Sequence, residues 1–65
     1  MTANRARELA DKCESLSEQY FYIYEASLNP SYRQKSTYYG ELSEGLYIAA
    51  EVLENEERRK YGSRT

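Results

Sequence analysis

The chain has 65 residues, which is room for one domain with a small hydrophobic core. Nine basic and eleven acidic residues give a formal net charge of −2, so the composition shows neither a strong basic excess for nucleic acid nor a polybasic membrane anchor. A single cysteine, Cys13, and the lack of histidine exclude an intrachain disulfide and argue against a zinc site. The sequence has no transmembrane-length apolar run and no signal-peptide core. We therefore expect a cytoplasmic protein without cofactors.

A first helix is predicted over about residues 3–28, because apolar residues recur at alternating steps of three and four. The predicted contact seam of this helix consists of Ala6, Leu9, Cys13, Leu16, Tyr20 and Ile23, widened by Ala10, Tyr24 and Leu28. Cys13 is interpreted as a small core residue rather than a nucleophile. The acidic residues are expected on the far side of the helix from the seam: Asp11, Glu14, Glu18 and Glu25.

The segment Asn29-Pro30-Ser31 predicts a break, since proline cannot continue a helix from its N-terminal side. Asn29 can cap a new helix with Pro30 at its first position, and Ser31 can equally start a capping box. The second helix is predicted over about 31–61, with Gly62 as its terminator and 62–65 as a loose tail. Its apolar positions are Tyr39, Leu42, Leu46, Ala49 and Leu53, flanked by Tyr32 and Ala50.

A tight turn makes the two helices antiparallel neighbours, so that position i faces roughly position 60 − i. Tyr20 is then expected opposite Gly40, and Leu16 opposite Leu46 or Gly45. The leucines would form an aliphatic tier near the chain ends. An aromatic tier would lie near the turn, with Tyr20, Phe21, Tyr24, Tyr32, Tyr38 and Tyr39. The predicted fold is an all-α antiparallel two-helix hairpin in a single domain, 1–65, which dimerises into a four-helix bundle.

Two glycines inside the second helix suggest that something approaches it closely, because each costs up to ~1 kcal/mol relative to alanine. Gly40 and Gly45 make room inside the hairpin, form a notch for another chain, or mark a break or kink in the helix. Ile48 and Val52 fall off the main seam and make a second apolar stripe with Gly45. A second copy or a different partner covers this stripe, or it is simply exposed. The candidate partner or dimer interface is therefore Tyr38, Gly40, Gly45, Ile48 and Val52.

Further surface residues offer other hypotheses. Tyr22 and Tyr47 fall outside both stripes and are candidate exposed hot spots. The acidic line could address a basic protein surface or imitate DNA phosphates, although a solvated helix face is the ordinary explanation. Basic residues gather at one end of the hairpin and give an alternative contact for nucleic-acid phosphates: Arg5, Arg7, Arg58, Arg59 and Lys60.

Catalysis is not expected. The chain has no histidine to act as a base near neutral pH, and a two-helix hairpin has no walled pocket for a small-molecule substrate. Gly40 and Gly45 lie inside a predicted helix and lack the lysine of a phosphate-binding loop. We therefore predict that the chain is not an enzyme.

Residues 38–53, YYGELSEGLYIAAEVL, place an aromatic residue, two glycines, alanines and a closing leucine on one helix. This pattern resembles a sequence motif found in many short phage and prophage accessory proteins, among them anti-activators of quorum-sensing regulators and some anti-CRISPR proteins. The resemblance implies a dimeric helical hairpin that binds a larger host or defence protein as a stoichiometric inhibitor or adaptor. The alternatives are a nucleic-acid-associated regulator that uses the basic end and a purely structural, self-assembling component.

Overall fold

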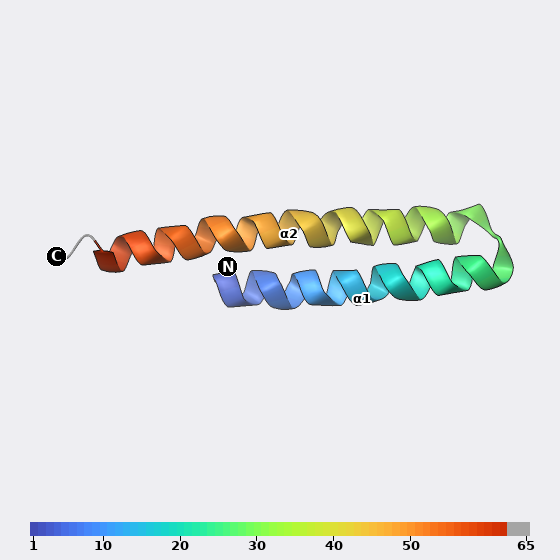
Figure 1. Cartoon of the computed structure of the whole chain (residues 1–65), viewed down its shortest axis with the longest axis horizontal. Helices are drawn as coiled ribbons and strands as arrows, with labels where there is room; N and C mark the ends of the chain where they lie inside the picture. Colours follow the sequence, from blue (N-terminus) through green and yellow to red (C-terminus); the bar gives the residue numbers. More distant parts are fainter. Residues whose placement is uncertain (63–65) are drawn as a thin grey trace.

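The structure, a computed structural model, describes residues 1–62 and the side chains of residues 1–60. It consists of two helices, α1 (Ala3–Ser27) and α2 (Pro30–Gly62), which lie side by side and antiparallel (Figure 1). The predicted all-α hairpin is confirmed. Neither described helix has the combination of length and hydropathy that is needed to cross a membrane.

The ends of α1 are fixed by local hydrogen bonds. Thr2 is the N-cap, and its hydroxyl accepts a hydrogen bond from the Arg5 N–H at 3.1 Å. At the other end Leu28 is left-handed, with φ 56° and ψ 23°, and its N–H donates to the Tyr24 carbonyl at 2.6 Å. Leu28 therefore lies outside α1, whereas the sequence predicts it inside the helix and on the core face. A left-handed residue reverses the chain direction here in the position that glycine usually takes.

The start of α2 distinguishes between the two predicted caps. The Asn29 side-chain oxygen accepts from the Ser31 N–H at 3.1 Å, and Pro30 is the first helical residue. Asn29 is thus the cap, with proline at the position where a missing N–H costs nothing. At its other end α2 includes Gly62, which the sequence predicts outside the helix; the rest of the predicted tail, 63–65, lies outside the described residues.

The seam between the helices is made of small side chains. The buried residues are Ala3, Ala6, Ala10, Ser36, Ser43 and Ala50. Ala3 and Ala10 in α1 are seven residues apart, as are Ser36, Ser43 and Ala50 in α2, which is the spacing of coiled-coil contacts. Ser17 continues the row on α1, and Ala6 lies between its first two members. No large side chain among the described residues is fully buried. Small residues on the contact line let the two backbones approach closely.

The large apolar residues that the sequence places on the seam lie beside it instead. Ile23 and Leu42 are 43% and 38% exposed, and Leu9, Leu16, Leu46 and Leu53 are half-buried. The physical reason is that a pair of helices covers only its centre line from both sides. Any side chain one step away from that line keeps one flank open.

The predicted register is confirmed near the chain ends. The Ala3 N–H donates to a Glu57 carboxylate oxygen at 3.4 Å, and Arg7 pairs with Glu54. The Glu57 carboxylate lies at the start of α1, whose first turn has no acidic residue of its own. A negative charge there is favourable because it faces the positive end of the helix dipole.

Nearer the turn, the predicted pairing of Tyr20 with Gly40 is wrong. A Cβ placed on Gly40 would lie 3.3 Å from the Ser17 hydroxyl, so Gly40 makes room for Ser17 and not for Tyr20. Tyr20 instead stacks on Tyr39, with ring centroids 5.7 Å apart. The difference follows from the rotation of both helices toward their small residues.

Candidate interaction surfaces

Six large apolar side chains form one broad side of the hairpin, which we call the apolar face: Leu9, Leu16, Ile23, Leu42, Leu46 and Leu53. At 100° per residue, those of each helix fall on one side of its small-residue row. Tyr20 and Tyr39 fall on the same sides and stack on each other, so the two sides form a single face. By the same spacing, the charged residues within 9–23 and 42–53 fall elsewhere on the helices.

Four residues of the predicted aromatic tier form a cluster that extends the apolar face toward the turn, whereas the other two, Phe21 and Tyr24, contact each other with ring centroids 6.4 Å apart. Besides stacking on Tyr39, the Tyr20 ring stacks on Tyr32, with centroids 6.2 Å apart. Tyr38 packs edge-on against Tyr39. The Lys35 ammonium lies 5.5 Å from the Tyr20 ring centroid and 5.6 Å from that of Tyr32. The cation therefore lies at the turn end of the apolar face, where it interacts favourably with the faces of two aromatic rings.

On the opposite side of the seam, Tyr47 joins the helices through two carboxylates. Its hydroxyl donates to Asp11 and, at 3.1 Å, to Glu14. These bonds place Asp11 and Glu14 beside the seam, not on the far side of α1 as predicted. The hydrogen bond to Asp11 is the main reason that the pKa of Tyr47 is raised above its ordinary value, with burial and Glu14 adding to it. Tyr47, expected as a free hot spot, is thus partly engaged within the hairpin.

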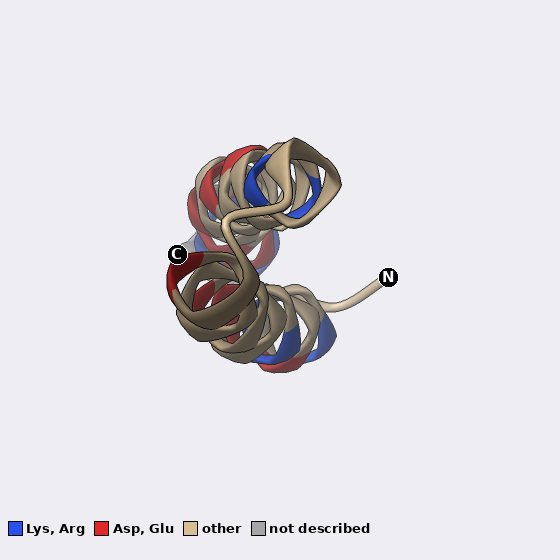
Figure 2. Cartoon of the chain, turned by 90° about the vertical axis from the view of Figure 1, so that its right-hand side faces the viewer, with Lys and Arg blue, Asp and Glu red and all other residues tan. Residues whose placement is uncertain are grey.

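This side forms an acidic face. Viewed along the hairpin from the turn, Asp and Glu positions of both helices gather on one side of the pair (Figure 2). A hollow of about 310 Å³ lies there, with Gly40, Ser17 and Ser43 near the seam and acids around them. The remaining lining residues are Glu14, Glu18, Glu44 and Tyr47. Tyr22, 70% exposed, lines a neighbouring hollow with Glu18, Phe21 and Glu25.

The side of α2 that points away from α1 carries an exposed apolar row, which we call the outer ridge: Tyr38, Gly45, Ile48 and Val52. The side chains of Tyr38, Ile48 and Val52 are 59%, 60% and 52% exposed. A Cβ placed on Gly45 would meet nothing within 4 Å. The predicted second stripe is therefore exposed, and Gly45 makes no room for Leu16 or any other part of the hairpin.

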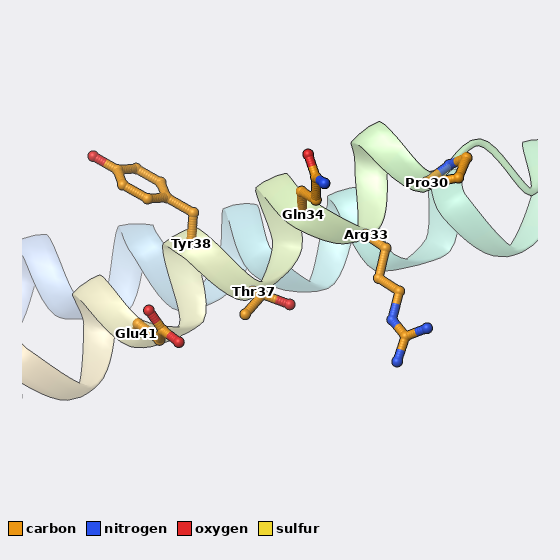
Figure 3. A pocket seen from close by; sticks show the side chains of 6 residues that line it. All are labelled: Pro30, Arg33, Gln34, Thr37, Tyr38 and Glu41. Atoms are coloured by element: carbon orange, nitrogen blue, oxygen red, sulfur yellow. The ribbon is translucent and has the colours of Figure 1, made fainter.

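Shallow hollows flank Tyr38 on the outer ridge. One of about 380 Å³ lies between Tyr38, Gly45 and Leu46, and connects the ridge to the apolar face. The other, about 440 Å³, is lined only by α2 residues, from Pro30 to Glu41 (Figure 3). Figure 3 shows Tyr38 and Gln34 on one side of the helix and Arg33 on the other. These hollows are surface grooves between the side chains of α2.

Gly40 does not belong with the other four residues of the predicted interface. It lies against Ser17 at the seam and lines the hollow on the acidic face, whereas the outer ridge points away from α1. Spacing along α2 could have separated Gly40 from Gly45, because five residues turn the chain by 500°, which leaves a net rotation of about 140°.

The predicted basic end is interleaved with acids. Arg5 pairs with Glu8 at 3.2 Å, and Arg58 pairs at 2.8 Å with Glu54, which also binds Arg7. The structure thus brings Arg7 and Arg58 to one carboxylate. The remaining cations of that end, Arg59 and Lys60, lie in the last turn of α2.

Sequence reasoning missed the small-residue seam and the bonds of Tyr47. The signal for the seam was present, as the seven-residue spacing of Ala3, Ala10 and Ser17 and of Ser36, Ser43 and Ala50. No protein-family model, curated protein or solved structure matches the chain.

Proposed function

We propose that this chain is a non-catalytic protein-binding regulator that contacts a larger protein through the outer ridge of α2. The observation that carries the proposal is Gly45. It is a glycine in the interior of a helix, with open space where its side chain would be, in a row of exposed apolar residues.

A glycine at this position lowers the stability of the hairpin, and no contact within the hairpin requires it. Alanine would favour the helix by up to ~1 kcal/mol and would meet no atom of the hairpin. Gly40, in contrast, is explained by its close approach to Ser17. A second chain that packs its backbone or a ring against Gly45, between Tyr38 and Ile48, accounts for the glycine and for the exposed apolar side chains together.

The kind of regulator follows from the shape and from the sequence. A thin rod of two helices offers faces and grooves to a partner, so its action is expected to be stoichiometric binding. The resemblance of residues 38–53 to phage accessory proteins favours an inhibitor or adaptor of a host or defence protein. The proposal includes a homodimer, since the hairpin leaves large apolar side chains uncovered.

The test is an affinity capture that compares the wild-type chain with two matched variants. Ile48→Asp places a charge on the outer ridge, and Glu51→Lys changes the charge one turn away on the acidic side. We expect one protein to be retained by the wild type and by Glu51→Lys and lost with Ile48→Asp. The complex, rebuilt from purified components, should have a fixed stoichiometry by light scattering.

Gly45 gives a second, sharper variant. Gly45→Ala should raise the melting temperature of the isolated chain and at the same time weaken the complex, and Gly45→Leu should weaken it further. Undiminished binding by Ile48→Asp and Gly45→Leu would refute the outer ridge as the contact surface. Binding that instead falls steeply with salt and needs Arg58 and Arg59 would favour a nucleic-acid partner.

A further inference from the structure

The apolar face needs a permanent cover. Between the helices the hairpin buries only alanines and serines, and its leucines stay half-buried or exposed. Methyl-sized side chains contribute little hydrophobic free energy compared with fully buried leucines. A chain of 65 residues without disulfide or metal commonly gains the missing stability by association. The one partner that is always present with the chain is another copy.

The size of the face suits a dimer. Along α1, 25 residues at ~1.5 Å each give about 37 Å, and two helices side by side are roughly 20 Å wide. The footprint is therefore on the order of 700 Å², close to the roughly 800 Å² per partner of a stable protein interface. The absence of charged residues over its middle fits the depletion of charge at interface cores.

Charge on the edges of the face selects one arrangement. By helical spacing, Arg5 and Lys12 border the face on the outer edge of α1, and Glu56 borders it on α2, whereas Glu41 falls on the outer ridge. Stacking α1 on α1 of another copy would place basic edge on basic edge. Stacking α1 on α2 places Arg5 next to position 55 or 56, and so beside Glu56, when the turns are level.

We infer that a second copy of this chain covers the apolar face, with the two-fold axis parallel to the rod, so that α1 of each copy stacks on α2 of the other. The leucines then become the core of a four-helix bundle. The outer ridge, which points sideways, remains open on both sides of the dimer. This inference rests on the homodimer of the proposed function and names the surface that forms it.

The first experiment measures mass and melting temperature of the wild-type chain across a hundredfold dilution. We expect twice the 7.6 kDa of one chain and a melting temperature that falls on dilution, because association stabilises the folded state by mass action. A folded monomer whose melting temperature is independent of concentration would overturn the inference.

Two matched variants identify the surface. Leu46→Asn on the apolar face should raise the dissociation constant of the dimer at least tenfold. It should also lower the helix content at low protein concentration. Ile48→Asn, two residues away on the outer ridge, should keep the wild-type mass and melting curve. An unchanged dimer with Leu46→Asn, or a lost one with Ile48→Asn, would assign self-association to the wrong face.

Chemical crosslinking tests the arrangement in the native dimer. Lys12→Cys and Gly45→Cys are made singly and together in a Cys13→Ala background and treated with a short bis-maleimide. The two sites lie on opposite outer edges of one hairpin, so a link between them must join two chains. We expect efficient crosslinked dimer only with both cysteines. Equal crosslinking by Lys12→Cys alone would mean that α1 stacks on α1.

The two proposals fail separately. Loss of partner capture with Ile48→Asp, in a chain that proves to be a stable monomer, would refute the dimer and keep the regulator. A dimer that depends on Leu46, together with undiminished capture by the outer-ridge variants, would keep the dimer and refute the outer ridge as the partner surface.

Discussion

Ser17 and Ser36 hold the two helices together by a reciprocal pair of hydrogen bonds. The Ser17 hydroxyl donates to the Ser36 carbonyl at 2.7 Å, and the Ser36 hydroxyl donates to the Ser17 carbonyl at 2.8 Å. The two hydroxyl oxygens are themselves 3.3 Å apart. Both residues lie on the small-residue seam, where side chains this short can reach the backbone of the opposite helix.

Removing either hydroxyl should destabilise the hairpin modestly. We expect Ser17→Ala and Ser36→Ala each to lower the free energy of unfolding by about 1 kcal/mol, measured by urea denaturation. Ser17→Leu should cost about 1–3 kcal/mol, because a large side chain cannot fit between Gly40 and the Ser36 backbone. A neutral Ser17→Leu would mean that the helices are not in close contact at this point.

The two helix glycines should respond differently to alanine. Gly45→Ala should raise the free energy of unfolding by roughly 0.5–1 kcal/mol, since helix propensity improves and the new Cβ meets nothing. Gly40→Ala should raise the free energy of unfolding by less, or lower it. The new Cβ would lie 3.3 Å from the Ser17 hydroxyl, which is held in place by its hydrogen bond to Ser36. Thermal unfolding of both variants beside the wild type gives the comparison, and equal gains would contradict the packing at Gly40.

Leu28 is a place where the chain can be stabilised. Its left-handed backbone costs a residue with a Cβ about 1 kcal/mol, and its side chain is 72% exposed. Leu28→Gly should therefore raise the free energy of unfolding by about 0.5–1 kcal/mol, with Leu28→Ala as the control that keeps the strain. A loss of stability with glycine would show that the exposed leucine makes a contact, such as one with a partner, that outweighs the strain.

Tyr47 predicts a pH dependence on the alkaline side. Its hydroxyl donates to Asp11 and Glu14, which raises the pKa of the folded state above the ordinary tyrosine value of about 10. The stabilisation is therefore complete below pH 10 and decreases as the pH rises through the folded pKa. Tyr47→Phe should be less stable than wild type at pH 7, and the difference should shrink above pH 10. Melting curves from pH 7 to 11 test this, with Tyr22→Phe as the control for general tyrosine ionisation.

The sequence predicts the turn and the helices well because local chemistry decides them. Proline at position 30 cannot extend a preceding helix, and Asn29 can cap the next one. The exposed row of Gly45, Ile48 and Val52 was also predictable, because its spacing places it away from any seam that α2 can use.

The seam itself was not predicted, because hydrophobic periodicity finds large apolar side chains and not the line of closest approach. Leu16 and Leu42 are part of that apolar pattern, yet their neighbours Ser17 and Ser43 lie nearer the opposite helix. In a bundle the leucines would be central, whereas in one hairpin they flank the contact. The bonds of Tyr47 to Asp11 and Glu14 depend on this rotation, so a pattern centred on the leucines could not reveal them.

The unequal lengths of the helices have a practical consequence. α1 begins at Ala3 beside Glu57, so residues 58–62 of α2 extend past the start of α1 (Figure 1). The basic residues Arg58, Arg59 and Lys60 lie in this overhang. A trypsin-like protease would trim the chain there first and spare the packed part, leaving a shortened rod that still carries both the apolar face and the outer ridge.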